Sequence, residues 1–284
     1  MLRDRQEQRR QAELFRRWHD GPDLLLLPNA WDVISARIFE TAGFKAIGTT
    51  SAGIAATLGY PDGQRISLQE MIAVTRRIVS GTKLPVSADL EAGYADTVEG
   101  VVAAVREALE TGIVGINLED STGKADRPLL PVAQQVERIA AIRAMADGEG
   151  IPLVINARTD AYMLAVGDME GRRRGAIERG RAYLEAGADC VFVPDLEDLD
   201  LRAIERLVRE ITGPVNLIAG RNTPPFAQLA SLGVSRVSFG PRPMRIALAL
   251  IRNFAREVIE QGTCECLKGD ALTYGEMNAM LAGK

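Results

Sequence analysis

Acidic side chains gather where short apolar segments of the sequence end. Asp89 and Glu91 are two residues apart at the end of the run 85–90, so on a strand both side chains would share one face. Glu119 ends the next apolar run, 115–119, and we expect it at a similar height. Carboxylates that converge on one point repel one another unless a cation neutralises them. Ligands that are all oxygen favour a hard cation, so this set predicts Mg²⁺, or Mn²⁺ in its place.

A basic residue, Arg158, lies in the segment 156–160 at the end of a later apolar run. A guanidinium there could hold a carboxylate or a developing enolate through two parallel hydrogen bonds. It could instead pair with one of the acids, and each acid taken alone could cap a helix. The small residues Ser51, Ala52 and Gly53 leave backbone N–H groups that could hold a carboxylate, although a tight turn has the same pattern.

Eight short apolar segments alternate with longer amphipathic segments over almost the whole chain. The apolar segments are near-continuous, which is typical of strands covered on both faces. Several amphipathic segments end in glycine just before the next apolar run, as at Gly43 and Gly112. Eight strand–helix units predict a closed (β/α)8 TIM barrel, whose active site lies at the carboxyl ends of its strands. The predicted strands are 24–27, 45–49, 85–90, 115–119, 153–157, 190–193, 215–218 and 236–239.

The rival architecture, an open doubly wound sheet, would need a glycine-rich first turn, and no G-x-G-x-x-G follows any predicted strand.

The first twenty residues predict an extra amphipathic helix around Phe15 that covers the barrel floor. No linker divides the chain, so we predict a single domain over 1–284, with the barrel at about 22–250 and a helical tail over 251–284. That tail either packs on its own barrel or exchanges with a neighbouring subunit.

The composition is that of an ordinary globular protein and argues against several classes. The 284 residues carry 34 Lys and Arg against 38 Asp and Glu, which gives a formal net charge of −4. This mild acidity argues against nucleic acid or an anionic membrane as a partner. No apolar run approaches the roughly 18 residues of a membrane helix, and the N-terminus lacks the apolar core of a signal peptide. Three cysteines do not make a disulfide framework, so a cytoplasmic enzyme is expected.

Seven stretches follow one another in a specific order between about residues 24 and 250. They are PNAWDVISARIFETAGFKAIGTTSAGIAATLGYPDG, PVSADLEAGYAD, GINLEDS, VINARTDAY, ADCVFVP, PVNLIAG and SRVSFGP. There the chain resembles the isocitrate lyase/phosphoenolpyruvate mutase superfamily. The resemblance implies a (β/α)8 barrel in a homo-oligomer, usually a dimer or tetramer that exchanges a C-terminal helix. It also implies a site that binds Mg²⁺ and a small-molecule 2-oxo acid, and that breaks or forms C–C or P–C bonds through an enolate.

The resemblance also implies roles for particular residues. The metal and its water molecules would be held by Asp62, Asp89, Glu91 and Glu119. The substrate would be bound by Ser51, Ala52 and Gly53 at its carboxylate, and otherwise by Asp62, Arg158 and Asn216. Catalytic roles would fall to Arg158, Glu119 and Lys124. For Lys124, in the loop after the fourth strand, a solvated loop position is the alternative.

Two departures from the family pattern bear on the reaction. The second acid of the usual Asp-x-Asp is Glu91 here, and its extra methylene would shift the metal's water molecules or narrow the pocket. The isocitrate and methylisocitrate lyases have a Lys-Lys-Cys-Gly-His loop after the fourth strand, with the cysteine as acid/base. This chain has neither Cys nor His over 119–127, so those two activities are not expected. Phosphonate members have a gating loop with lysine and asparagine, to which only Lys124 corresponds.

The inventory of proton donors is short. The only histidine, His19, precedes the first strand and is expected to be a surface or packing residue. Acid/base work therefore falls to a water molecule, a carboxylate, Tyr60, Tyr94 or Lys124. Asp195, after the sixth predicted strand, is a further acid on the active face.

Three functions agree with these residues. The first is a Mg²⁺-dependent lyase that acts on a small 2-oxo acid through an enolate, by decarboxylation or C–C cleavage of the oxaloacetate type. The second is phosphonate P–C bond chemistry, a mutase or hydrolase of the phosphonopyruvate type. The third is a non-catalytic protein that binds a 2-oxo acid. The first is favoured because stabilising an enolate needs mainly a Lewis acid, which Mg²⁺ supplies.

Overall fold

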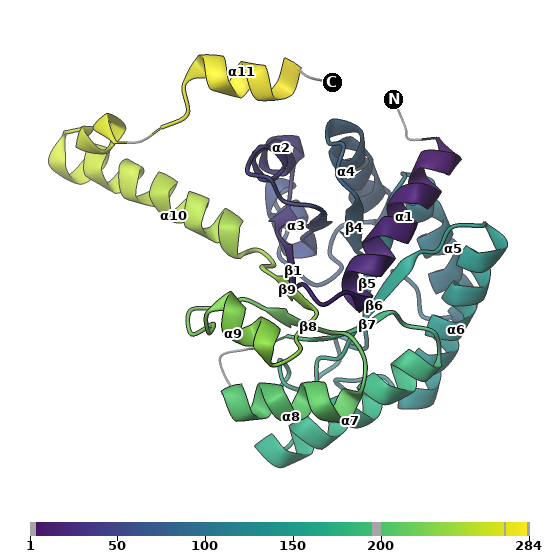
Figure 1. The fold of residues 1–284 in the computed structure, drawn as a ribbon. Helices are drawn as coiled ribbons and strands as arrows, with labels where there is room; N and C mark the ends of the chain where they lie inside the picture. The colour runs from purple at the N-terminus through teal and green to yellow at the C-terminus, as the bar shows by residue number, and fades with distance from the viewer. Residues whose placement is uncertain (1–3, 195–199, 270, 283–284) are drawn as a thin grey trace.

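A computed structural model describes residues 4–194, 200–269 and 271–282, so the predicted acid Asp195 lies outside the described residues. Short parallel strands form a ring with helices around it (Figure 1). The strands are β1 (Leu25–Leu27), β2 (Asn29–Ala30), β3 (Ile47–Thr49), β4 (Val86–Asp89), β5 (Gly115–Glu119), β6 (Val154–Arg158), β7 (Cys190–Val193), β8 (Val215–Ile218) and β9 (Arg236–Ser238). The helices are α1 (Arg5–Asp20), α2 (Val33–Thr41), α3 (Ser51–Thr57), α4 (Leu68–Gly81), α5 (Val98–Leu109), α6 (Val132–Gly148), α7 (Met169–Glu185), α8 (Leu201–Ile211), α9 (Phe226–Ser231), α10 (Arg242–Arg256) and α11 (Tyr274–Ala282).

The ring closes through its first strand, which Pro28 divides into β1 and β2. Proline has no N–H to donate to a neighbouring strand, so the ladder is interrupted there. β1 pairs with β9, whereas β2 pairs with β3, and each remaining strand pairs in parallel with its neighbour in sequence. All eight predicted strands are present, and the predicted (β/α)8 barrel is confirmed.

Local sequence signals explain where most helices begin. Short polar side chains precede them and accept a hydrogen bond from the backbone N–H three residues later. The strands between these helices are almost wholly buried, as their continuous apolar sequences predict. The capping residues of this kind are Asp4, Asp32, Thr50, Ser67, Thr97, Asp168 and Asp200.

The extra helix α1 covers the N-terminal end of the barrel. Its Phe15 is fully buried and lies against the start of β5, where a Cβ at Gly115 would come within 2.8 Å of the Phe15 ring. Gln8 donates hydrogen bonds to the carbonyls of Leu109 and Ile113, at 2.9 and 2.8 Å. These contacts tie α1 to the segment that enters β5, so the predicted floor cover is present.

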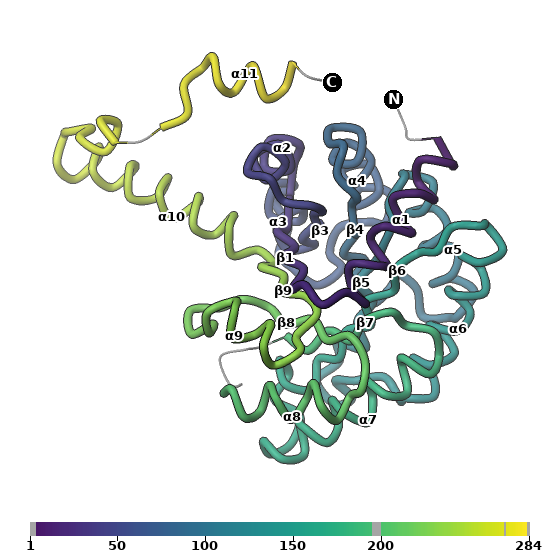
Figure 2. Tube along the Cα trace, in the orientation of Figure 1, coloured from purple at the N-terminus to yellow at the C-terminus, as the bar shows by residue number. Residues whose placement is uncertain are grey.

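The C-terminal tail extends away from the barrel along α10 and returns so that α11 lies beside α2 (Figure 2). α10 exposes a row of large apolar side chains, which includes Ile246, Leu250 and Ile251 at 62–66% of their surface. The predicted exchange of this tail between subunits stays a prediction. No helix among the described residues is both long enough and apolar enough to cross a membrane.

His19 is a buried packing residue of α1. Its ring meets Phe15 edge-on at 4.8 Å, and its Nδ1 lies 2.8 Å from the Phe15 carbonyl. Burial, followed by the charge of Arg236, lowers the pKa of His19 to about 3. An unfolded histidine has a pKa of about 6.5, so in the native state this ring stays neutral where the unfolded chain binds a proton.

We predict that His19 makes the fold sensitive to acid. Because the unfolded chain gains the proton, the free energy of unfolding should fall by about 2 kcal/mol between pH 7 and pH 5 through this residue alone. Urea titrations of the wild type and of His19→Asn, which keeps a side-chain donor, would measure it at both pH values. Because the carboxylates titrate in both proteins, the difference between their two pH-dependent changes in the free energy of unfolding reports His19 alone. Equal pH dependence in the two proteins would contradict the prediction.

Candidate active site

A cavity of about 210 Å³ opens at the carboxyl ends of the barrel strands. Acidic side chains from the segment after β3 and from the end of β4 share its lining with basic side chains from the end of β6 and from α10, which follows β9. The acids in the lining are Asp62 and Asp89, and the cations are Arg158, Arg242 and Arg245. The cavity therefore brings together three of the charged residues that the sequence pointed to, Asp62, Asp89 and Arg158, whereas Glu91 and Glu119 are not in its lining.

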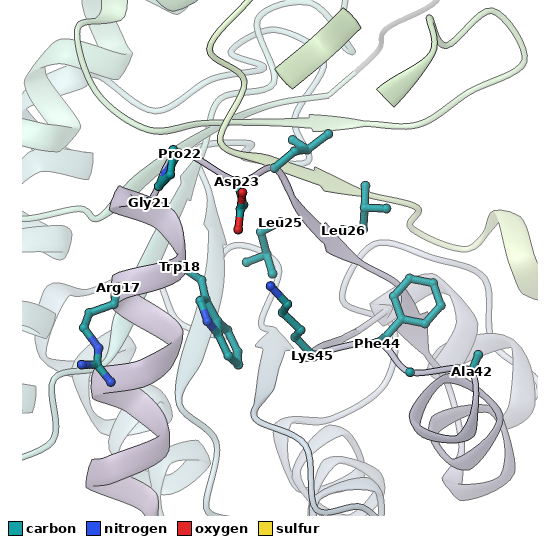
Figure 3. Close-up of a pocket in the computed structure, with 12 residues that line it drawn as sticks. Arg17, Trp18, Gly21, Pro22, Asp23, Leu25, Leu26, Ala42, Phe44 and Lys45 are labelled. Carbon is teal, nitrogen blue, oxygen red and sulfur yellow. The ribbon is translucent and has the colours of Figure 1, made fainter. Parts of the chain in front are cut away.

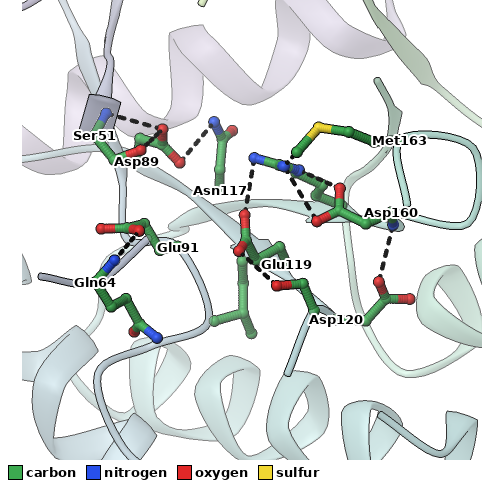
Figure 4. A network of polar contacts seen from close by, with 12 residues as sticks. Ser51, Gln64, Asp89, Glu91, Asn117, Glu119, Asp120, Asp160 and Met163 are labelled. Atoms are coloured by element: carbon green, nitrogen blue, oxygen red, sulfur yellow. Dashed lines mark hydrogen bonds and ion pairs between the residues drawn. The ribbon is translucent and has the colours of Figure 1, made fainter. Parts of the chain in front are cut away.

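Asp89 ends β4 and is held by the first turn of α3. Its Oδ2 accepts hydrogen bonds from the backbone N–H and the hydroxyl of Ser51, at 3.0 and 2.8 Å. Its own N–H donates to Thr49 Oγ1 at 2.8 Å. Its other oxygen, Oδ1, lies 3.5 Å from Asn117 Nδ2. One carboxylate oxygen is thus committed to α3, and the second is only weakly engaged (Figure 4).

Glu91 lies two residues beyond Asp89 in a left-handed backbone conformation, with φ of 50°. One of its oxygens accepts a hydrogen bond from the Gln64 backbone N–H at 2.6 Å, and the other accepts one from the Tyr94 hydroxyl at 2.9 Å. Burial, followed by the charge of Asp89, raises the pKa of Glu91 to about 7. Glu91 is therefore a fixed acid near Asp89, but the prediction that the two share one face of a strand is wrong, because β4 ends at Asp89 and Glu91 stands in a turn beyond it.

Arg158, at the end of β6, is held between two acids. Its Nη1 pairs with Glu119 at 2.8 Å, and its Nε and Nη2 donate to the two oxygens of Asp160 at 2.6 and 3.1 Å. Burial raises the pKa of Glu119 to about 8, although the Arg158 charge opposes that rise. The structure thus contains the ion pairing that the sequence offered as the alternative for Arg158, and the arginine also lines the cavity. Its contact with a substrate stays a prediction.

The acids fit a hard cation that keeps most of its water molecules. Asp62, Asp89, Glu91 and Glu119 all offer oxygen, and the charge of Asp89 raises the pKa of Glu91 and Glu119. Within the described part of the chain, no three Asp, Glu, His or Cys side chains converge tightly enough to hold one ion together. Mg²⁺ is commonly bound by one or two carboxylates and several waters, so this spread-out donor set suits it.

Some of the other residues that the sequence predicted for the site line the cavity, and some do not. Ala52 lines the cavity, whereas Gly53 packs against Thr50 and Trp31 and donates its N–H to Thr50 Oγ1 at 3.3 Å. Asn216 is fully buried and donates to Ser238 Oγ at 3.3 Å, and it is not part of the cavity lining. Lys124 lies on an exposed loop that lines a neighbouring cavity of about 440 Å³. The structure thus separates Gly53, Asn216 and Lys124 from the cavity, and their roles stay predictions.

Sequence reasoning missed two cations of the cavity, Arg242 and Arg245. They lie on the first turn of α10, directly after the last barrel strand. Their position after a strand's carboxyl end was the available signal, because the loops that follow barrel strands form the active face. It also missed that Asp160 would hold Arg158, since a hydrogen bond between residues two apart depends on how the chain turns.

A larger cavity, of about 420 Å³, lies at the other end of the barrel between α1, β1 and the end of α2 (Figure 3). Trp18, Leu25 and Phe44 give it apolar walls, and Arg17 and Lys45 reach its edge. It contains a single acid, Asp23, and lies away from the strand ends that carry the acid cluster. Its volume therefore does not make it the candidate active site, because the cluster of acids and arginines lies at the opposite end.

Similarity to known proteins identifies the family of this chain. Residues 15–259 match the family described as phosphoenolpyruvate phosphomutase. The chain belongs to this family. It is 36% identical over 240 residues to an uncharacterized protein of Mycobacterium tuberculosis strain H37Rv, which covers 84% of this chain and 86% of the relative. It is also 32% identical over 265 residues to a protein of Corynebacterium glutamicum named as probable 2-methylisocitrate lyase 1, with 90% and 84% covered.

Solved structures agree with this membership. A Burkholderia cenocepacia J2315 protein described as a lyase or mutase superimposes with a TM-score of 0.90 and 36% identity, covering 98% of both chains. A phosphonopyruvate hydrolase in complex with oxalate and Mg²⁺ shares the fold with a TM-score of 0.83 at 24% identity, over 96% of this chain and 94% of that one. The superfamily predicted from the sequence is therefore confirmed, and it includes several different reactions.

We predict that shortening Glu91 weakens cation binding. In Glu91→Asp the carboxylate retracts by one methylene and cannot keep both Gln64 and Tyr94 as partners from the same backbone position. The Mg²⁺ dissociation constant should rise about tenfold, a loss of about 1.4 kcal/mol. Isothermal titration calorimetry would measure it, with Glu70→Asp in the exposed cap of α4 as the control. Wild-type affinity in Glu91→Asp would mean that the longer acid is neutral for the site.

Proposed function

We propose that this protein is a Mg²⁺-dependent carbon–carbon lyase that acts on a small 2-oxo acid through an enolate. The reaction would be a decarboxylation or C–C cleavage of the oxaloacetate type. The observation that carries the proposal is the small cavity that places Asp62 and Asp89 with Arg158, Arg242 and Arg245 at the strand ends. An acidic side for a cation and a basic side for anions is the arrangement that a 2-oxo acid dianion with its metal requires.

In this proposal Asp89 is the main protein ligand of Mg²⁺, through the oxygen that is not committed to Ser51. Asp62, Glu91 and Glu119 would contact the water molecules of the ion, because they surround Asp89 without converging on one point. When bound, Mg²⁺ would supply a Lewis acid beside the 2-oxo group, which lowers the cost of an enolate.

Arg158 would stabilise the negative charge that develops on the substrate. The two acids that pair with it fix its guanidinium in advance, so no reorganisation is needed during the reaction. The same pairing neutralises much of its charge, which explains why the cavity contains two further arginines. Arg242 and Arg245 would bind the second anionic group of the substrate. Glu119, whose pKa burial raises while the Arg158 charge opposes the rise, would take the remaining catalytic role beside Arg158.

Phosphonate chemistry is the second candidate, and the same two arginines support it. A phosphonate group carries up to two negative charges, which suits a pair of guanidinium groups at least as well as a carboxylate does. The lysine of the phosphonate family pattern is less favourable, because Lys124 faces the neighbouring cavity. Release of phosphate from phosphonopyruvate, with no turnover of oxaloacetate or branched malates, would select this candidate. Tight binding without any turnover would indicate a 2-oxo acid binding protein.

The proposal includes a homo-oligomer, a dimer or tetramer that exchanges the C-terminal helix. The exposed apolar side chains of α10 support it, since side chains such as Ile246 and Leu250 are left in water in a single chain. The chain's partners would therefore be a small 2-oxo acid and further copies of itself.

We predict that Asp89→Ala abolishes both Mg²⁺ binding and Mg²⁺-dependent turnover. The fold should survive, because removing one carboxylate relieves the repulsion among those that remain. Calorimetry with Mg²⁺ and a turnover assay with oxaloacetate, branched malates and phosphonopyruvate would test it, and thermal unfolding would verify the fold. Unchanged Mg²⁺ affinity would remove Asp89 from the metal site.

We predict that both Arg158→Ala and Arg158→Lys lose about a hundredfold in kcat/KM, which corresponds to roughly 3 kcal/mol. Lysine keeps the charge but not the planar fork, so it cannot hold Asp160 and Glu119 and also contact the substrate. Steady-state kinetics on the substrate that turns over would measure the loss. Arg158→Ala also leaves two buried acids unpaired, so Arg158→Lys separates catalysis from stability. Near-normal kcat/KM in either variant would show that the arginine is structural.

A further inference from the structure

The segment 90–97, between β4 and α5, holds Glu91 close enough to Asp89 for the Asp89 charge to raise its pKa, and does so in a strained backbone conformation. Glu91, Gly93 and Tyr94 have φ of 50°, 92° and 57°, so three of four consecutive residues are left-handed. For a residue other than glycine this region costs of order 1 kcal/mol or more, so the surrounding structure must impose it. At Gly93 a side chain would also collide with Val101, only 2.7 Å from the Cβ position.

A buried arginine on α6 holds the backbone of this segment. Arg138 is 3% exposed, and its Nη1 donates to the Ala92 carbonyl at 3.3 Å. Its Nη2 donates to the carbonyls of Ala95 and Asp96, at 3.3 and 2.9 Å. One planar guanidinium therefore bridges three carbonyls within five residues and closes the turn.

A second residue, Gln64, also holds the segment, and it lines the same neighbouring cavity of about 440 Å³ as Arg138. Its backbone N–H donates to the Glu91 carboxylate, and its side-chain oxygen accepts from the Tyr94 N–H at 2.8 Å. The Glu91 carbonyl accepts from the Glu119 N–H at 2.9 Å, which ties the segment to β5. Glu91 thus has its side chain fixed by Gln64 and Tyr94, and the backbone that follows it fixed by Arg138.

Packing alone does not explain a buried guanidinium at this position. Burying the charge is costly, and a long apolar side chain would fill the same space without that cost. All the hydrogen bonds of Arg138 within the described residues go to main-chain oxygens of this one segment. The planar fork matches several carbonyls at once, which a single ammonium does not.

We propose that Arg138 is a positioning residue that sets where the Glu91 carboxylate stands at the cation site. It acts through the backbone of 92–96 and touches neither substrate nor cation. The part that concerns Mg²⁺ rests on the proposed function, whereas the restraint on the segment does not.

The test compares Arg138→Met with Arg143→Met. Arg143 lies on the same helix with a side chain only 15% exposed, but it pairs with Asp189 and donates to the Gly187 carbonyl. Both variants should lose stability in urea titrations. Only Arg138→Met should speed amide hydrogen exchange over 92–96 by at least tenfold, and only it should raise the Mg²⁺ dissociation constant by about tenfold. Should Arg138→Met not fold, Arg138→Lys replaces it, with smaller changes of the same kind.

A double-mutant cycle tests whether the effect passes through Glu91. In a Glu91→Gln background, Arg138→Met should leave the Mg²⁺ dissociation constant unchanged within twofold. The proposal would be overturned if Arg138→Met left amide hydrogen exchange over 92–96 unchanged. It would also be overturned if Arg138→Met weakened Mg²⁺ binding equally in the wild-type and in the Glu91→Gln background. If instead the wild type binds no Mg²⁺, or Asp89→Ala binds it normally, the proposed function fails. Hydrogen exchange in Arg138→Met then still decides whether the arginine restrains the segment.

Discussion

Repulsion among carboxyl groups is the constraint that shapes the open end of this barrel. Asp89, Glu91 and Glu119 lie on neighbouring strand ends where burial removes the water that would screen them, and the pKa of two of them is raised. Arg158 offsets part of this charge but is shared with Asp160. The excess is what a divalent cation would balance, so the same crowding that costs folding free energy prepares the site for an ion.

The acids persist in this arrangement because rigid partners hold each of them. Ser51 holds Asp89, Gln64 and Tyr94 hold Glu91, and Arg158 holds Glu119. These partners come from three strand ends, because Ser51 and Gln64 follow β3, Tyr94 follows β4, and Arg158 ends β6. A barrel is suited to this, because parallel strands bring every such loop to one end while the helices outside stabilise the frame.

Below the site the barrel interior is polar, in contrast to the apolar core outside the ring. Arg236 is fully buried and its Nη2 lies 3.3 Å from Asn117 Oδ1, which also accepts from Asn156 at 2.8 Å. Asn117 in turn lies next to Asp89. A chain of contacts thus runs from Arg236, whose charge lowers the pKa of His19, through Asn117 to Asp89.

The family contains enzymes that catalyse different reactions with one barrel fold. The residues of this chain favour some of these reactions over others. The loop after β5 lacks the cysteine and histidine expected of isocitrate and methylisocitrate lyases. Glu91 replaces the shorter acid of the family pattern, and the site accommodates its length through Gln64 and Tyr94. Two arginines of α10 add positive charge to the cavity, which favours a substrate with a second anionic group.

The sequence by itself determined the barrel and which strand ends carry the acids. Continuous apolar runs, helix caps and glycine stops are local signals, and the closed ring follows once eight units repeat. Only the tertiary structure decided that Asp160 and Glu119 hold Arg158. It also decided that Asn216 lies outside the cavity lining, whereas Arg242 and Arg245 are part of that lining. The reason is that strand periodicity specifies a face, whereas side-chain direction and partners depend on loop turns and on contacts between residues far apart in the chain.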